Sequence, residues 1–156
     1  PVIPVGNKGL VIEKVDGPSH LKVVEEFGYE MYMHCGAIRK VLLAWQTPAF
    51  IDEYFKNIIL HDQAFPHVRP DDLREELKKI RQDGYAITHG EYVTDALGIG
   101  APVFNSDGEL AGSIGIIAPE IRVDTPEFLD TQKDLVQFYA SSLSADLGYE
   151  KHDVFQ

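Results

Sequence analysis

The chain has 156 residues, of which 44% are hydrophobic and 25% are charged, a composition typical of one folded globular domain. Its 14 Lys and Arg residues against 25 Asp and Glu give a net charge of −11, which argues against direct binding of nucleic acid or an anionic membrane surface. The single cysteine, Cys35, excludes an internal disulfide and favours a cytoplasmic location, and no apolar run reaches the length of a membrane helix.

The chain starts at Pro1 without a methionine or a signal peptide, and its first residues already resemble a strand. We therefore expect residues 1–156 to form one domain cut from a longer protein. The segment upstream would then carry part of the function.

The first half of the chain predicts short strands followed by two helices. Strands are expected over residues 2–5 and 9–15, joined by a glycine-rich turn, and a third over residues 20–27. One helix is predicted to open at residues 36–38 and to run to Ala44. A second is predicted to begin at Pro48, because the apolar residues that follow recur at helical spacing.

A third helix is predicted over residues 70–83. Pro70 suits the first helical turn, and Leu73, Leu77 and Ile80 form an apolar stripe at i, i+4 and i+7. Gly84 suits the position just past the last turn.

The clearest strands follow, over residues 85–91, 95–104 and 110–118. The last two are joined by Asn105-Ser106-Asp107-Gly108, a sequence typical of a hairpin. Glycine weakens strands, so the glycines inside these strands predict a bulge or a close approach of backbone or ligand; they are Gly98, Gly100, Gly112 and Gly115.

A last helix is predicted to start at Thr125, with a hydroxyl that caps it, and to end near Leu147. We expect its buried side to carry its large apolar residues, Phe128, Leu135, Phe138, Tyr139 and Leu143. Strands and helices are segregated along the chain, which predicts an α+β fold.

Four stretches, in order and with compatible spacing, carry a resemblance to a known family. Residues 33–44, Met-His-Cys-Gly-Ala-Ile-Arg-Lys-Val-Leu-Leu-Ala, are similar to the family pattern Leu-His-x-Thr-Ala-x-Gly-Lys-Ala-Leu-Leu-Ala. Residues 73–91, 98–108 and 111–119 match further segments. Together they resemble the effector-binding domain of IclR-type (isocitrate-lyase-regulator type) bacterial transcription factors.

The resemblance implies a GAF/profilin-like curved antiparallel sheet with flanking helices. It implies a winged helix-turn-helix DNA-binding domain upstream, so that DNA is contacted only through that domain. It further implies a homodimer or homotetramer, and a small metabolite, often a carboxylic acid, as effector. Neither a catalytic residue nor a cofactor is expected.

Two departures from the family pattern bear on the ligand. The glycine before the family lysine is Arg39 here, and two family serines correspond to Gly115 and Ile117. The loss of two hydroxyl donors suggests a ligand that is larger or more apolar than a small oxo-acid, such as an aromatic metabolite.

The turn at residues 36–38 is the centre of the candidate site. If it opens a helix, its free N–H groups and the helix dipole favour an anion such as a carboxylate. Strand alternation adds apolar lining, although each of these side chains taken alone is more often simply core. The predicted effector-binding residues are Val23, Met31, Gly36, Ala37, Ile38, Thr88, Ala96, Gly98, Gly115 and Ile117. We expect Gly115→Phe to block binding and leave the fold intact.

Histidine and cysteine residues raise two alternatives. His34 and Cys35 are adjacent, but neighbours in an extended segment point to different sides, so packing is favoured over a nucleophilic pair. His61 and His67 could bind a metal, yet no ligand set of defined spacing accompanies them. His89 could bond a ligand, titrate against Glu91 or lie on the surface.

Three functions therefore remain open. The first is a sensor of a small organic acid or aromatic metabolite. The second is an oligomerisation module with a vestigial pocket. The third, with the least support, is a hydrolase that uses Cys35 or a metal held by the histidines, because no nucleophile–base–orienter set is visible.

Overall fold

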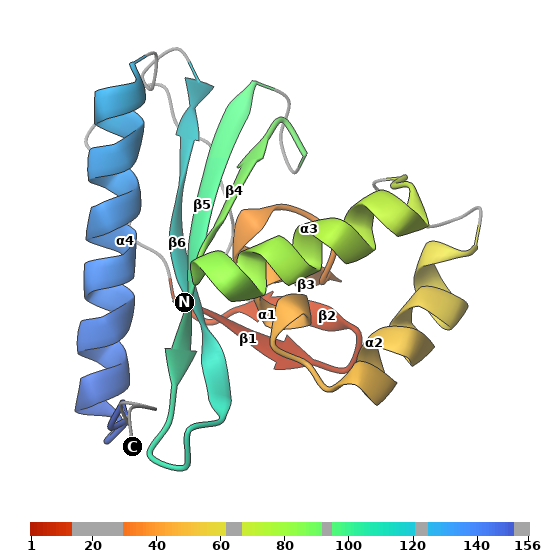
Figure 1. Ribbon diagram of the computed structural model, residues 1–156, viewed down its shortest axis with the longest axis horizontal. Helices are drawn as coiled ribbons and strands as arrows, with labels where there is room; N and C mark the ends of the chain where they lie inside the picture. Colours follow the sequence, from red (N-terminus) through yellow and green to blue (C-terminus); the bar gives the residue numbers. More distant parts are fainter. Residues whose placement is uncertain (14–29, 62–66, 92–94, 121–124, 152–156) are drawn as a thin grey trace.

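The computed structural model describes residues 1–13, 30–61, 67–91, 95–120 and 125–151. It contains a six-stranded sheet in the order β3-β2-β1-β6-β5-β4, with all neighbouring strands antiparallel. The strands are β1 (Val2–Val5), β2 (Lys8–Val11), β3 (Glu30–Tyr32), β4 (Ala86–His89), β5 (Ala96–Phe104) and β6 (Leu110–Pro119). The helices are α1 (Ala37–Ala44), α2 (Pro48–Tyr54), the π-helical turn η1 (Phe55–Ile59), α3 (Pro70–Asp83) and α4 (Pro126–Asp146). The predicted α+β fold, a curved antiparallel sheet with flanking helices, is confirmed (Figure 1).

The sheet bends where its two halves meet. β5 and β6 pair along their whole lengths, whereas β1 is joined to β6 through a single residue pair, Val2 with Ser113. Beyond this pair β1 and β2 leave the plane of β5 and β6, as Figure 1 shows. The curvature gives the sheet a concave face, which α1 occupies.

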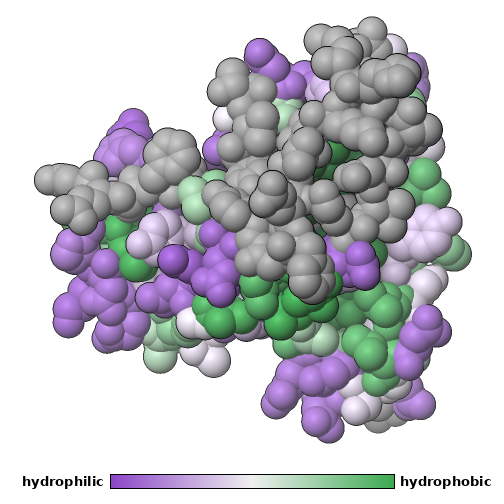
Figure 2. Space-filling model, turned by 180° about the vertical axis from the view of Figure 1, so that it is seen from behind, coloured by the Kyte–Doolittle hydropathy of each residue, from purple (hydrophilic) through white to green (hydrophobic). Residues whose placement is uncertain are grey.

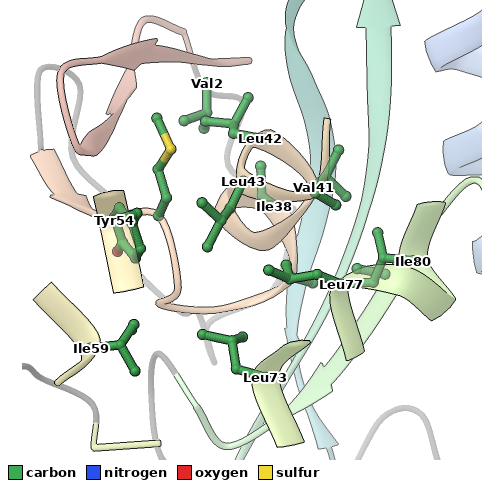
Figure 3. Close-up of a cluster of buried hydrophobic side chains, with 14 of the residues drawn as sticks. Val2, Ile38, Val41, Leu42, Leu43, Tyr54, Ile59, Leu73, Leu77 and Ile80 are labelled. Carbon is green, nitrogen blue, oxygen red and sulfur yellow. The ribbon is translucent and has the colours of Figure 1, made fainter. Parts of the chain in front are cut away.

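Helix α1 is the centre of the larger core. All eight of its residues are buried, between the sheet on one side and α2, η1 and α3 on the other (Figure 3). The predicted stripe of α3 is confirmed, because Leu73, Leu77 and Ile80 are its buried residues. Gly84 ends α3 with φ of 81°, a left-handed conformation that suits glycine.

Helix α4 covers the opposite face of β5 and β6 (Figure 1). The predicted cap is confirmed, since Thr125 Oγ1 accepts a hydrogen bond from the Phe128 N–H at 3.2 Å. The prediction of its buried side is wrong for four of the five residues, and only Leu143 packs against the buried cluster beneath α4. Phe128, Leu135, Phe138 and Tyr139 are exposed and Leu143 is half-buried, while the buried residues are the smaller Val136, Ala140 and Ser144.

The physical reason is spacing between layers. A helix can lie close against a sheet only where its side chains are small, and α4 presents its small residues to β5. The large aromatic residues and Leu135 then face outward, whereas Leu129 and Leu143 are half-buried and pack against the same cluster. The helix carries two apolar stripes, and only the sheet decides which of them is buried.

Other strands agree with the predictions in part. β2 ends at Val11, and the short strand β3 was not predicted. The strand predicted over residues 20–27 lies outside the described residues. The predicted hairpin is confirmed: Gly108 donates to the carbonyl of Asn105 at 3.0 Å, and the register shifts after Val103.

Hydrophilic and hydrophobic residues are unevenly distributed on the face of the molecule that is turned away in Figure 1. Hydrophilic residues crowd the end that carries α2 and α3, and hydrophobic residues gather in the middle of that face (Figure 2). Within the described segments, no helix has the length and apolar character needed to cross a membrane.

Candidate functional site

Helix α1 begins without a side-chain cap. Gly36, with φ of 84°, takes the N-cap position, where α2 and α4 instead carry the capping threonines Thr47 and Thr125. The first N–H of α1, on Ala37, donates to Thr88 Oγ1 of β4 at 3.0 Å. A strand hydroxyl thus takes the role that a cap residue has elsewhere.

Strand glycines let α1 approach the sheet closely. A Cβ atom on Gly100 would lie 2.8 Å from the Cα of Ile38, and one on Gly98 would lie 3.3 Å from the Ala37 Cβ. Ser113 Oγ also donates to the Ile38 carbonyl at 2.8 Å. The predicted close approach at these glycines is therefore an approach of backbone, between the sheet and the first turn of α1.

A small cavity lies at this helix end. It has a volume of about 20 Å³, enough for about one water molecule. Its described lining is Cys35, Gly36, Ala37, Ile38, Arg39, Thr88, Ala96, Gly98 and Ile117. The structure thus brings together seven of the ten predicted residues, Gly36, Ala37, Ile38, Thr88, Ala96, Gly98 and Ile117.

The other three predicted residues lie elsewhere. Met31 is on β3, paired with Gly9, and is absent from the described lining. Val23 lies outside the described residues. Gly115 sits under Ile38, where an added Cβ would be 2.6 Å from Ile38 Cγ1 and 2.0 Å from the Ile99 carbonyl oxygen. The expectation that Gly115→Phe leaves the fold intact is therefore wrong, because even the first carbon of the new side chain has no space.

Two lining residues were missed, Cys35 and Arg39. Both flank the turn at residues 36–38 directly, so their position next to that turn could have indicated them. Arg39 is 2% exposed, and its Nε donates to the Gly9 carbonyl at 3.1 Å. The departure from the family pattern at this position places a buried cation beside the cavity.

An ion cluster around the buried Lys40, with two partly exposed carboxylates, holds α1 to its neighbours. The Lys40 side chain is 1% exposed, and its Nζ lies 2.9 Å from both carboxylate oxygens of Glu76 on α3. It also bonds Glu91, just past β4. The cluster ties α1 to α3 and to the end of β4. Because its members are 36 and 51 residues from Lys40 in the chain, sequence spacing could not show it.

The histidines have structural or surface positions. His34 is buried, and its Nδ1 lies 2.7 Å from the Tyr54 hydroxyl. Burial raises the pKa of that hydroxyl well above its ordinary value, which keeps it protonated. His89 Nδ1 is 2.9 Å from Glu120 rather than bonded to Glu91.

The metal alternative gains no support. His61 and His67 are exposed, and in the part of the chain that the structure describes no group of three or more His, Cys, Asp or Glu side chains is arranged to hold a metal.

The fold and the cavity define an α+β domain with a small cavity at a helix N-terminus. Residues 3–145 match the family described as "Bacterial transcriptional regulator IclR C-terminal", and the chain belongs to this family. The resemblance inferred from the sequence is thereby confirmed.

Curated relatives agree. The chain is 30% identical over 141 residues to the uncharacterized HTH-type transcriptional regulator RhmR of Escherichia coli K12, covering 89% of this chain and 54% of that protein. It is 26% identical over 145 residues to the HTH-type transcriptional regulator KipR of Bacillus subtilis 168, covering 92% and 58%. The chain therefore spans about half the length of these relatives. They are named as transcriptional regulators.

Solved structures share the fold. The IclR of Thermotoga maritima is 28% identical, with a TM-score of 0.84 over 95% of this chain and 60% of that one. A putative transcriptional regulator from Rhodococcus sp. RHA1 has a TM-score of 0.86 over 94% of this chain and 60% of that one, at 18% identity. The second likeness shows the fold alone.

Proposed function

We propose that this chain is the effector-binding domain of a longer, cytoplasmic IclR-type regulator. Its cavity would take a small carboxylic acid or aromatic metabolite and thereby change DNA binding by an upstream winged helix-turn-helix domain. Its own part would be binding rather than catalysis. The observation that carries the proposal is the N-terminus of α1, which opens on a mostly apolar cavity.

The chemistry of this helix end supports an anionic ligand. The Ala37 N–H is satisfied by the neutral hydroxyl of Thr88, without a carboxylate from a capping side chain. A ligand carboxylate in the same place would accept a charge-assisted hydrogen bond, which is shorter and stronger. The positive end of the α1 dipole would add to the attraction.

The size of the cavity sets a condition on this proposal. About 20 Å³ does not hold a ten-atom acid, so binding must widen the site. The half-buried Ile117 is the lining side chain best placed to move, since the others are small or are buried residues of α1 itself. If only a fraction of the molecules has the widened cavity before binding, the apparent Kd equals the Kd of the widened form divided by that fraction.

Coupling to DNA binding requires that the ligand prefer one arrangement of the whole protein over another. The ion cluster around Lys40 offers a route, because it joins the cavity-lining helix α1 to α3 and to the end of β4. A shift of α1 on ligand binding would therefore displace α3 and the end of β4 as well.

A thermal-shift screen against small carboxylic and aromatic acids tests the proposal. An acid at 100 times its Kd adds about 2.7 kcal/mol to the stability of the folded state. For a domain of this size we expect the melting temperature to rise by roughly 5–10 °C. Ala96→Val, which adds two methyl groups to the cavity wall, should abolish that rise.

Ala111→Val is the matched control. It makes the same change on β6, where Ala111 packs against the buried cluster beneath α4, around Ile99 and Val136, and does not line the cavity. Its ligand-induced rise should equal that of the unmodified protein. A rise that persists in Ala96→Val would contradict the placement of the ligand in this cavity.

The second candidate function is an oligomerisation module with a vestigial pocket. The small volume of the cavity favours it, and so does the outer face of α4, where Phe138 is 63% and Tyr139 59% exposed. Large apolar residues from Phe128 to Tyr139 precede the small, mostly exposed residues Ser141, Ser142 and Ala145. An antiparallel pair of α4 helices from two copies would set large residues against small ones.

Light scattering distinguishes this candidate from the sensor. In an oligomer built on α4, Phe138→Ser should reduce the molar mass to that of a monomer, without lowering the free energy of unfolding of the monomer. An unchanged molar mass in this variant would exclude the α4 contact. The thermal-shift screen is independent of this result.

A further inference from the structure

A second, larger cavity lies on the other side of α1, among α1, α2 and α3. It has a volume of about 300 Å³, at the lower end of the range for small-molecule sites. Its described lining is Ala44, Gln46, Pro48, Ile51, Asp52, Arg74, Leu77, Lys78 and Arg81. None of these residues lines the cavity at the α1 N-terminus.

This second cavity is a groove whose charge is opposite in sign to the net charge of the chain. Arg74, Lys78 and Arg81 lie at i, i+4 and i+7 on α3, which places them on one face of the helix. The only acidic side chain in the described lining is Asp52. Even with Glu75, which pairs with Lys78 from outside the lining, three cations face two carboxylates, so the site is positive on a protein whose net charge is −11.

The three cations are held to different degrees. Arg74 pairs with Asp52 at 3.2 Å and stacks over the Phe55 ring at 4.1 Å, so it closes one end of the groove. Arg81 makes one long hydrogen bond, from Nη1 to the Ala44 carbonyl at 3.3 Å. Lys78 pairs with Glu75 in an exposed ion pair, which solvent screens strongly. Lys78 and Arg81 are therefore the cations best able to take a new anionic partner.

The floor between these cations is apolar. Leu77 and Ala44 are buried there, and Pro48 and Ile51 come from the facing helix α2. Gln46 holds its side-chain amide to the Leu42 carbonyl at 3.0 Å, which fixes the end of the groove beside α1. An apolar floor next to Lys78 and Arg81 fits a ligand with an apolar body and an anionic head.

We infer that this groove binds a small amphiphilic organic anion. Its carboxylate or phosphate head lies against Arg81 and Lys78, and its apolar body packs on Leu77 and Ile51.

Chemical-shift titration of the isotope-labelled chain tests this site directly. Heptanoate and hexyl phosphate both carry a hexyl chain and differ in the head, so comparing their affinities shows which anion the site prefers. We expect either to shift the amides of residues 49–52 and 74–81 saturably. The double variant Lys78→Gln/Arg81→Gln should weaken binding at least tenfold.

The matched control is Lys56→Gln/Lys79→Gln, which removes two exposed cations that do not line the groove and changes the net charge equally. Its affinity should equal that of the unmodified chain. Equal weakening in both double variants would overturn the site, as would equally strong binding of inorganic phosphate, which has no apolar body. Loss of binding in Ala96→Val would assign the ligand to the first cavity and also overturn it.

Discussion

The two faces of the sheet are packed in opposite ways. On the concave face, α1 lies against strand glycines, and the small residues belong to the sheet. On the opposite face, the fully buried apolar residues of α4 are the smaller Val136 and Ala140, which pack on larger strand residues such as Leu97 and Ile99, and the leucines Leu129 and Leu143 are only half-buried. Close packing of a helix on a sheet needs small residues on one side of the contact, and each face of this protein supplies them from a different side.

The difference shows what apolar patterns can indicate. On the α1 face the glycines mark the place of closest approach, and the candidate site lies there. On the α4 face the large apolar residues mark the surface that remains after packing. Large residues therefore do not identify the buried side of a helix whose contact is made by small ones.

The largest effect is expected from Gly100→Ala. The added Cβ would lie 2.8 Å from the Cα of Ile38, a backbone atom that cannot move aside without displacing α1. We expect a loss of about 3 kcal/mol or more in the free energy of unfolding, at the upper end for overpacked cores. Urea denaturation measures it.

Gly108→Ala is the control for that loss. Gly108 has open space around its Cβ position and a φ of 76°, so it tests backbone strain without a clash. We expect a cost of about 1 kcal/mol. Equal losses in the two variants would show that α1 is not packed as closely as described.

Tyr54→Phe should have the next largest effect. It removes the hydroxyl that lies 2.7 Å from His34 Nδ1 and leaves a buried polar group without this partner. We expect a loss of about 2 kcal/mol at neutral pH. Thermal denaturation of the two proteins at pH 7 measures it.

The same variant changes the dependence on pH. Burial raises the pKa of Tyr54 in the folded state, so above pH 10 the unfolded chain loses its proton first and stability falls as pH rises. Tyr54→Phe should lose less stability between pH 9 and 11 than the unmodified protein. An identical slope in both would contradict the buried environment of this hydroxyl.

Removing one hydroxyl on each face of the sheet compares the packing of the two faces directly. Thr88 accepts from the buried Ala37 N–H, and Ser144 accepts from the part-buried Phe104 N–H at 3.0 Å. We expect Thr88→Val to cost about 2 kcal/mol and Ser144→Ala about 1 kcal/mol, because the first leaves the more buried donor unpaired. The reverse order in chemical denaturation would mean that α4, not α1, is the more tightly fixed helix.

The smallest effect on stability is expected from Phe138→Ser. The residue is 63% exposed, and its ring contacts Tyr139 on the same helix. The free energy of unfolding should change by no more than about 0.5 kcal/mol. A loss of several kcal/mol in the monomer would mean that this face is buried by a part of the chain outside the described residues.

Much of the local structure could be predicted from the sequence. The stop at Gly84, the cap at Thr125 and the hairpin at residues 105–108 depend on neighbouring residues only, so local chemistry was sufficient. The turn at residues 36–38 was found for the same reason. The strand β3 was missed because it has three residues and depends on pairing with β2.

The sequence predicted most of the residues that line the cavity, but it did not predict the volume of the cavity. The turn that opens α1 indicated Gly36, Ala37 and Ile38, and strand alternation added Thr88, Ala96, Gly98 and Ile117, because both signals are properties of the local backbone. These signals could not show that Gly115 lies under Ile38, or that the cavity has a volume of only about 20 Å³, because both depend on how closely α1 approaches β5 and β6.

By itself, the sequence determined the family, the order of elements, the caps and turns, and the apolar stripe of α3, all of which depend on contacts within a few residues or on patterns along the chain. Only the tertiary structure decided which face of α4 is buried, how Lys40 finds Glu76 and Glu91, and which cations of α3 border an apolar groove. These features depend on distances between elements far apart in the chain, and such distances are set by the packing of whole layers.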